Sequence, residues 1–138
     1  MSKNQKGLKL KDNLDLSKSK NEDNLLGVYK SQNEDELIGA YKDWALLYDK
    51  DNDDLLGTVS QPNSVKIFHE YLKDSKLKII DVGCGTGLVG LELKNLGFSN
   101  FDGIDLSQEM IDIAQGRGYN SLFLGNLNKS LPIDSNSY

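Results

Sequence analysis

The sequence predicts an α/β fold, in which an open parallel sheet belongs to a three-layer α/β/α arrangement and a helical cap precedes it. Short apolar runs at residues 77–82, 101–106 and 121–125 alternate with helical patterns at 88–96 and 109–115. The first run leads through closely spaced glycines directly into a helix. Strands that alternate with helices at this spacing are typical of βαβ units with right-handed crossovers.

The N-terminal part of the chain is polar. Residues 1–35 are rich in Lys, Asn, Asp, Ser and Glu, and so little apolar surface does not offset the entropy of ordering the chain. We therefore expect a disordered tail. Within it, residues 21–30 are nearly repeated as residues 33–42, with a period of 12 residues. A short period seen twice does not make a solenoid, and it indicates local duplication of a helix-start segment.

Residues 36–75 have the pattern of a helical cap. In the first predicted helix the apolar side chains recur every three or four residues and share one face: Leu37, Ile38, Tyr41, Trp44, Ala45 and Tyr48. Residues 49–57 are acidic and predict a loop. A second helix opens at residues 62–64, with its apolar side at Val65, Ile67, Phe68, Tyr71 and Leu72. His69 lies beside this apolar side, and we expect it at the surface.

Residues 76–138 predict the strands and helices of the sheet. The run at 77–82 is almost continuously apolar, as expected of a strand that is buried on both faces. Helix 88–96 is amphipathic and ends at Gly97, a typical C-cap residue. Ser107 is a candidate N-cap for helix 109–115, and Gly116 and Gly118 end that helix. The run at 121–125 is the weakest of the three strands.

Composition narrows the class of protein. The 138 residues carry a formal net charge of −5, and this acidic balance disfavours binding to a nucleic-acid backbone. Cys84 is the one cysteine and His69 the one histidine, which excludes an intramolecular disulfide and argues against a zinc site. The sequence shows no apolar leader and no run of membrane-spanning length. We expect a cytoplasmic protein without metal, nucleic-acid or membrane partners.

The glycines after the first strand fit two patterns. Residues 85–90 match the dinucleotide pattern G-x-G-x-x-G, and Asp105 follows at about the expected interval of ~20 residues. In that frame the strand would continue through Asp81 and bury an unpaired carboxylate inside a parallel sheet, which is unfavourable. In the other frame the strand ends at residues 81–82 and the next glycines form the loop. Asp81 then lies at the carboxyl edge of the sheet, beside a ligand crevice, and the sequence favours this frame.

The run Asp-Val-Gly-Cys-Gly-Thr-Gly at residues 81–87 resembles motif I of class I S-adenosylmethionine-dependent methyltransferases. The resemblance implies a Rossmann-like sheet and S-adenosyl-L-methionine as the cofactor. It also implies that the loop of Gly83, Cys84, Gly85 and Gly87 passes close to the methionine part and the ribose of the cofactor. Asp81 would either hold this loop through backbone N–H groups or contact the cofactor's amino group, directly or through water.

Two further signatures agree with this resemblance. Residues 103–110 resemble the family's strand-end acid within D-x-S-x-x-M. By that resemblance Asp105 accepts hydrogen bonds from both ribose hydroxyls, which suits a two-oxygen acceptor, and Leu106 and Met110 border the adenine. The family often has an acid where Asn126 stands, in contact with the adenine amino group. Asparagine keeps an acceptor oxygen but lacks the charge, and Asn126 and Leu127 complete the expected cofactor-binding set.

Upstream, residues 41–49 resemble the Y-x-x-W-A-x-x-Y-D helix of methyltransferases related to the Williams-Beuren syndrome methyltransferase-like proteins. In related enzymes this helix caps the cofactor pocket, so Tyr41, Trp44 or Tyr48 is expected to contact cofactor or substrate. Tyr48 is the preferred contact because it lies at the helix end, beside Asp49. Trp44 is equally compatible with packing on the sheet.

The remaining residues have simpler interpretations. Gly97 and Gly103 are expected to be turn and packing glycines. Cys84 is expected to fill a small, partly buried position in the loop, because the sequence shows no base that would make it a nucleophile. Methyl transfer needs chiefly proximity and alignment, and no catalytic base can be named from the sequence.

The sequence ends where the family's fourth strand would be expected to follow, so we expect a fragment or a truncated product that lacks the C-terminal half. The unpaired edge of the first strand would then favour self-association. The predicted function is S-adenosylmethionine-dependent methylation of a small-molecule acceptor. The alternatives are a non-catalytic cofactor-binding fragment and an NAD(P)-dependent oxidoreductase.

Overall fold

A three-stranded parallel sheet organises the C-terminal part of the chain. The computed structural model describes residues 20–56, 60–72, 74 and 76–138. The strands are β1 (Ile79–Val82), β2 (Phe101–Asp105) and β3 (Leu122–Leu124), in the spatial order β1-β2-β3. The register places Asp81 beside Gly103 and Asp105 beside Leu124. The predicted α/β class with an open parallel sheet is confirmed, and each strand is one or two residues shorter than its apolar run.

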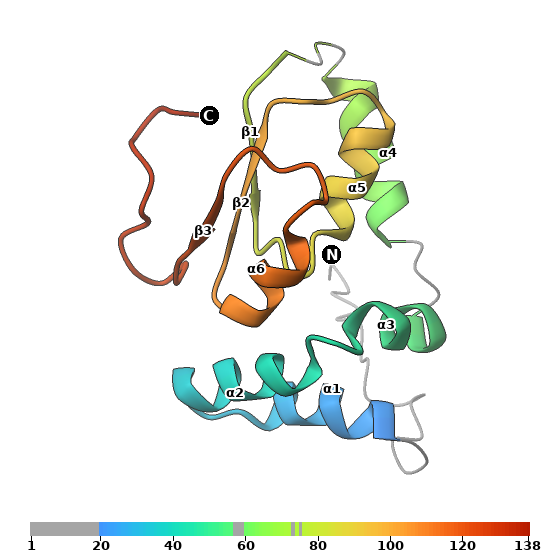
Figure 1. Ribbon diagram of the computed structural model, residues 1–138, viewed down its shortest axis with the longest axis vertical. Coiled ribbons are helices and arrows are strands. Elements are labelled where there is room, and N and C mark those ends of the chain that lie inside the picture. Colours follow the sequence, from blue (N-terminus) through green and yellow to red (C-terminus); the bar gives the residue numbers. More distant parts are fainter. Residues whose placement is uncertain (1–19, 57–59, 73, 75) are drawn as a thin grey trace, which may run out of the picture.

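Helices cover one face of this sheet. They are α4 (Ser60–Tyr71), α5 (Leu88–Asn95) and α6 (Gln108–Ala114), and Figure 1 shows them on the opposite side of the sheet from the C-terminal segment 125–138. The core between helices and sheet contains Val65 of α4, Leu93 of α5, Phe98 and Phe101, all at most 3% exposed. Burying such side chains supplies most of the driving force for docking these helices.

The predicted ends of α5 and α6 follow from their caps. Gly97 has a φ of +87° and follows the C-cap residue Leu96, as predicted. The side chain of Ser107 accepts a hydrogen bond from the backbone N–H of Met110 (3.3 Å), which confirms Ser107 as an N-cap. Gly103 is a packing glycine as expected, because an added Cβ would lie 2.9 Å from side-chain atoms of both Leu122 and Tyr119.

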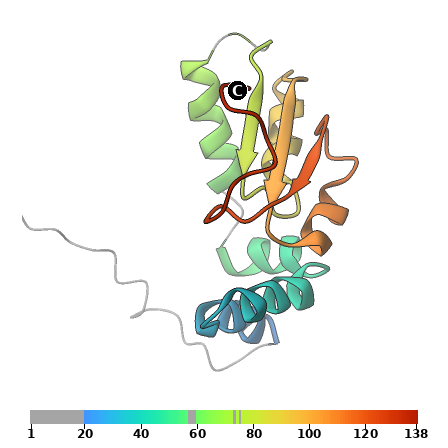
Figure 2. The same cartoon turned by 90° about the vertical axis from the view of Figure 1, so that its left-hand side faces the viewer.

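The N-terminal cap consists of α1 (Lys20–Lys30), α2 (Glu34–Trp44) and α3 (Tyr48–Leu56). Figures 1 and 2 show these helices together across one end of the sheet. Helix α2 begins with a reciprocal cap: the Glu36 N–H donates to the Asn33 side chain (2.9 Å), while the Glu36 carboxylate accepts from Gln32 and Asn33. Such a box satisfies donors that a helix start leaves free.

Part of the predicted disordered tail is instead a helix. Residues 1–19 lie outside the described part of the chain, but residues 20–30 form α1, which packs against α2. The two copies of the repeat therefore form two neighbouring helices. At Gly27 an added Cβ would lie 3.7 Å from Cβ of Ala40, an ordinary contact distance, so α1 and α2 lie close together at this point. The polar composition was a poor guide here because α1 gains its apolar contacts from another helix.

The predicted loop at residues 49–57 is also wrong for the part that the structure describes. The predicted single helix through Tyr48 ends at Trp44, and a new helix, α3, runs over Tyr48–Leu56. Acidic side chains in a first helical turn interact favourably with the helix dipole. Moreover, Asp51 is 1% exposed and accepts a hydrogen bond from Nε1 of Trp44 (2.8 Å). Asp51, one of the acids that indicated a loop, is thus buried in a contact with another helix.

Candidate functional site

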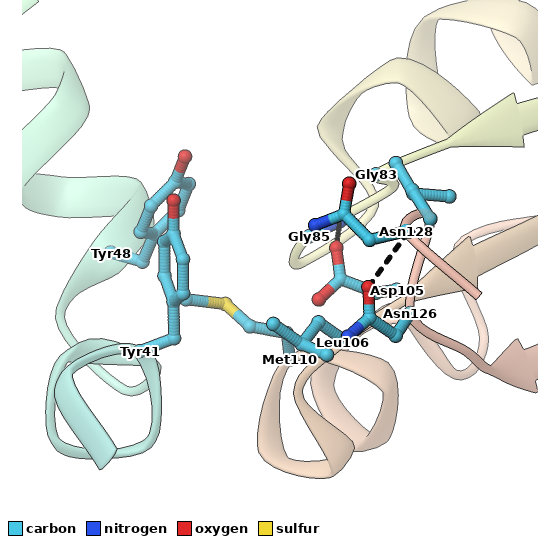
Figure 3. Close-up of a pocket in the computed structure, with 10 residues that line it drawn as sticks. Tyr41, Tyr48, Gly83, Gly85, Asp105, Leu106, Met110, Asn126 and Asn128 are labelled. Carbon is cyan, nitrogen blue, oxygen red and sulfur yellow. Dashed lines mark hydrogen bonds between the residues drawn. The ribbon is translucent and has the colours of Figure 1, made fainter. Parts of the chain in front are cut away.

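A pocket of about 270 Å³ lies between the cap and the carboxyl ends of the strands (Figure 3). Eight of the predicted cofactor-binding residues line it together with two further residues. The lining comprises Tyr41, Tyr48, Gly83, Gly85, Asp105, Leu106, Met110, Asn126, Leu127 and Asn128. In an open α/β sheet, ligands bind at the carboxyl ends of the strands, and the pocket lies at that position.

The glycine loop presents bare backbone to the pocket. Gly83 has a φ of +80° and Gly85 a φ of +52°, a conformation that other residues rarely adopt. A Cβ added to either would meet no atom within 4 Å, so the backbone there faces open space. The N–H groups of Gly83 and Cys84 donate to the Ile104 carbonyl (2.8 and 3.0 Å), which fastens the loop to β2.

Asp105, the last residue of β2, joins the loop to α6. Its Oδ2 accepts from the backbone N–H of Gly85 (2.8 Å), and its Oδ1 accepts from the backbone N–H of Ser107 (2.9 Å). A carboxylate offers about four acceptor positions, so both oxygens keep capacity for further donors. Asp105 lines the pocket and is therefore suited to binding a pair of hydroxyl groups.

Asp81 lies outside the pocket lining. Its Oδ2 accepts a hydrogen bond from the hydroxyl of Tyr119 (2.6 Å), a residue from the loop between α6 and β3. Burial raises the pKa of Asp81 above its ordinary value, the hydrogen bond from Tyr119 lowers it, and the charge of Asp105 raises it. The structure thus places Asp81 against a tyrosine rather than against the backbone N–H groups of the loop.

Gly87 also lies away from the pocket. With a φ of +89° it forms the N-cap of α5, and an added Cβ would lie 2.9 Å from the ring of Tyr119. At Gly90 an added Cβ would lie 2.4 Å from the same ring, and the Gly90 N–H donates to the Tyr119 hydroxyl (3.1 Å). These two glycines make room for a tyrosine. Only Gly83 and Gly85 of the glycine series face the pocket.

Cys84 fills a buried position of the loop, where a partly buried one was predicted, and it lies outside the pocket lining although it belongs to the predicted cofactor-binding set. It is 6% exposed, and burial, followed by the charges of Asp105 and Asp81, raises the pKa of its thiol to about 12. A thiol in this state is a poor nucleophile, since the thiolate is the reactive form.

The thiol of Cys84 is expected to react very slowly with a thiol reagent in the native chain. At pH 8 its thiolate fraction should be roughly a thousandfold below that of a free cysteine of pKa ~8.5. Colour release from Ellman's reagent measures this rate, with the urea-unfolded chain as the fast control. Labelling of the native chain at the unfolded rate would contradict a buried thiol.

The cap supplies an aromatic wall. Tyr48, the first residue of α3, and Tyr41 of α2 both line the pocket, and Figure 3 shows the two rings facing the glycine loop from the other side of the pocket. Trp44 is 4% exposed and its ring lies 4.8 Å from that of Tyr48. Burial, with the nearby charge of Asp105, raises the pKa of Tyr41, so its hydroxyl stays protonated. Of the three predicted aromatic candidates, Trp44 packs within the cap and the two tyrosines line the pocket.

The segment after β3 closes the far end of the pocket. Leu106 supplies apolar surface from the β2–α6 connection, Met110 supplies it from α6, and Leu127 supplies it from the segment after β3. The carboxamide oxygen of Asn126 accepts from the backbone N–H of Asn128 (2.8 Å), which forms a local turn. That oxygen keeps one acceptor position, so it can still accept the predicted hydrogen bond from the adenine amino group.

Two lining residues are missing from the predicted set. In the single helix predicted from the sequence, Tyr41 shares a face with Trp44 and Tyr48, and sequence alone does not rank three aromatic residues on one face. No sequence signal marks Asn128. Nor does any sequence signal mark Tyr119, which is distant in sequence from Asp81 and donates a hydrogen bond to it.

Metal-binding clusters and membrane-spanning helices are both absent from the described residues. In the part of the chain that the structure describes, no His, Cys, Asp and Glu side chains gather into a group of three or more that could hold a metal ion. Within the same residues, every helix is too short or too polar to cross a membrane.

The sequence was compared with known proteins. Residues 79–138 match a family model described as a methyltransferase domain. Ribosomal protein L11 methyltransferase of Thermotoga petrophila is 35% identical over 52 residues, 38% of this chain and 19% of that protein. A protein of Geobacillus sp. (strain WCH70), named as a methyltransferase without a stated acceptor, is 35% identical over 74 residues, 54% of this chain and 30% of that protein.

A third relative is the mitochondrial ubiquinone biosynthesis O-methyltransferase of Candida albicans, which is 43% identical over 47 residues, 33% of this chain and 14% of that protein. The chain thus spans less than a third of the length of these curated relatives. The matched family model covers all three strands, the glycine loop and most of the pocket lining. Residues 79–138, which form the sheet and the glycine loop, are therefore similar in sequence to a methyltransferase domain.

Proposed function

We propose that the chain binds S-adenosyl-L-methionine and belongs to an enzyme that transfers its methyl group to a small-molecule acceptor. The observation that carries this proposal is the meeting of the glycine loop and the Asp105 carboxylate at adjacent strand ends, on one pocket. The similarity of residues 79–138 to a methyltransferase domain supports the same chemistry.

The residues present fit this cofactor. Gly83 and Gly85 expose backbone that a Cβ would otherwise cover, which suits close approach of the methionine part and ribose. Asp105 has acceptor capacity left for two vicinal hydroxyls. Leu106, Met110 and Leu127 provide the apolar surface that a purine ring needs, and Asn126 provides a polar edge.

The cofactor supplies an electrophilic methyl group on a sulfonium. The chain's own contribution is to bind and orient, since an in-line displacement depends on proximity and alignment. Tyr41 and Tyr48 narrow the pocket opening and reduce the access of water. No described residue in the pocket is assigned as a catalytic base, because an acceptor that is already nucleophilic needs none.

The proposed acceptor is a small molecule. By their names, the relatives act on different acceptors, a ribosomal protein in one case and an intermediate of ubiquinone biosynthesis in another, so the acceptor does not transfer by similarity. The cap supports a small acceptor, because two tyrosines cover the pocket from the side opposite the loop.

The dinucleotide alternative has less support. In that pattern Gly85, Gly87 and Gly90 would serve the ligand and the helix packing beside it. Here Gly87 and Gly90 lie against Tyr119, and the additional glycine that faces the pocket is Gly83, which the dinucleotide pattern does not require.

Calorimetric titration of the full chain tests the proposal. S-adenosylhomocysteine and S-adenosylmethionine are expected to bind at a single site, and NADH is expected not to compete. Binding of NADH without binding of S-adenosylhomocysteine would instead support an oxidoreductase.

Transfer of a labelled methyl group to any of a panel of small nucleophiles separates an enzyme from a non-catalytic binding fragment.

Sedimentation of the same sample over a range of concentrations checks the proposed self-association through a sheet edge.

A further inference from the structure

Three ion pairs join the cap to the sheet and its helices within the described residues. Two of them are exposed, Lys42–Glu109 and Glu34–Lys129, with side chains 36–64% accessible. Pairs of this kind contribute little to stability, because solvent and salt screen their attraction. The third pair, Asp49–Arg117, is closer (2.6 Å) and less exposed, with side chains 33% and 20% accessible. It is the pair best suited to fixing the position of the cap.

Asp49 uses both carboxylate oxygens. Oδ2 accepts from Nη2 of Arg117 (2.6 Å), just beyond α6, and Oδ1 accepts from the hydroxyl of Thr86 (2.5 Å). Thr86 is 1% exposed and lies in the glycine loop between Gly85 and Gly87. Nη1 of Arg117 is buried without a hydrogen-bond partner among the described residues. The guanidinium is therefore held through its ion pair with the Asp49 carboxylate.

The neighbour of Asp49 in the chain is Tyr48, which lines the pocket. Both residues lie in the first turn of α3, so the bonds of Asp49 determine where that turn sits relative to the glycine loop. The ring of Tyr48 also packs edge-on against Trp44. A carboxylate outside the pocket lining therefore determines how a pocket-lining ring is placed.

We propose that Asp49 is a positioning residue for cofactor binding, which fixes Tyr48 in the pocket wall by fastening α3 to Thr86 and Arg117. The proposal rests on the proposed function for its ligand. Asp51 serves as the contrast. It is more buried, but its side chain bonds Trp44 and Asn24 within the cap and does not reach the glycine loop.

Affinity for S-adenosylhomocysteine is the first test. Asp49→Asn is expected to raise the dissociation constant about tenfold, the equivalent of ~1.4 kcal/mol, at a temperature where the variant is fully folded. Thr86→Val, which removes only a hydroxyl donor, is expected to have a smaller effect in the same direction. Lys42→Gln removes an exposed ion pair and is the matched control, with an unchanged constant.

A double-mutant cycle tests whether Asp49 acts through Tyr48. In a Tyr48→Ala background, Asp49→Asn is expected to change the dissociation constant little further, because the ring that it positions is gone. A purely structural role would lower the melting temperature and leave the affinity of the folded variant unchanged. That result, or effects of the two substitutions that simply add, would overturn the proposal.

A measurement without ligand separates this proposal from the proposed function. Trp44 is the one tryptophan of the chain and contacts Tyr48, so its fluorescence and near-ultraviolet circular dichroism report on that ring. Asp49→Asn is expected to change both signals and Lys42→Gln neither. If S-adenosylhomocysteine fails to bind the wild-type chain, the proposed function is overturned, while the Trp44 signal still tests whether Asp49 positions Tyr48. An unchanged Trp44 signal in Asp49→Asn would overturn the proposal that Asp49 positions Tyr48.

Discussion

Alanine in place of Asp105 is expected to weaken the binding of S-adenosylhomocysteine about 100-fold. Two ribose hydroxyls would lose a charged acceptor, and hydrogen bonds to charged groups contribute about 1.5–3 kcal/mol each. The backbone N–H of Gly85 also loses its acceptor at 2.8 Å, which loosens the loop. Calorimetric titration measures the change, and thermal unfolding shows how much of it comes from lost stability.

Asp105→Asn and Asp112→Asn complete this experiment. Asparagine at 105 keeps one acceptor oxygen, so an intermediate affinity is expected. Asp112 is an exposed acid on the same helix that follows Asp105, where it pairs with Gln108 (2.8 Å), and its substitution should leave the affinity unchanged. Unchanged affinity for S-adenosylhomocysteine in Asp105→Ala would contradict a role of Asp105 in cofactor binding.

Alanine in place of Gly90 is expected to destabilise the fold by about 2 kcal/mol, although alanine is the better helix former. Its Cβ would lie 2.4 Å from a ring carbon of Tyr119, and overpacking of this kind typically costs about 1–3 kcal/mol. The ring cannot retreat easily because its hydroxyl bonds Asp81 (2.6 Å). Urea unfolding followed by circular dichroism measures the difference in the free energy of unfolding.

Gly39→Ala is the matched control for this substitution. Gly39 also lies within a helix, α2, but an added Cβ there meets nothing within 4 Å. Stability should rise by up to about 1 kcal/mol, the difference in helix propensity between the two residues. With Tyr119→Leu in the background, Gly90→Ala should become less harmful or stabilising. Equal effects of Gly90→Ala in both backgrounds would show that the Tyr119 ring is not the reason why position 90 requires glycine.

Much of the sheet region could be predicted because its signals are local. The loop glycines at 83, 85 and 87 require positive φ values, Ser107 caps the helix that it precedes, and Gly97 ends another. Each of these depends on residues a few positions apart. The alternation of apolar runs and helical patterns then places Asp105 and Asn126 at the same sheet edge, where both line the pocket.

The cap was harder to predict because its contacts join residues that are far apart in the sequence. The acids of residues 49–54 indicate a loop when each is considered with its neighbours, yet they belong to α3. Asp49 bonds Arg117 across 68 positions of the chain and Thr86 across 37. Contacts at that separation are created by the folded arrangement and leave no periodicity in the sequence.

The sequence alone determined the α/β class, the glycine turn and the acid that ends the second strand, because backbone conformation and periodic burial are encoded by adjacent residues. Only the tertiary structure decided which glycines face the ligand and which make room for Tyr119. It also decided that Tyr48 and Tyr41, rather than Trp44, line the pocket. Those choices depend on which side chains meet across the sheet and the cap, and packing between distant segments sets that.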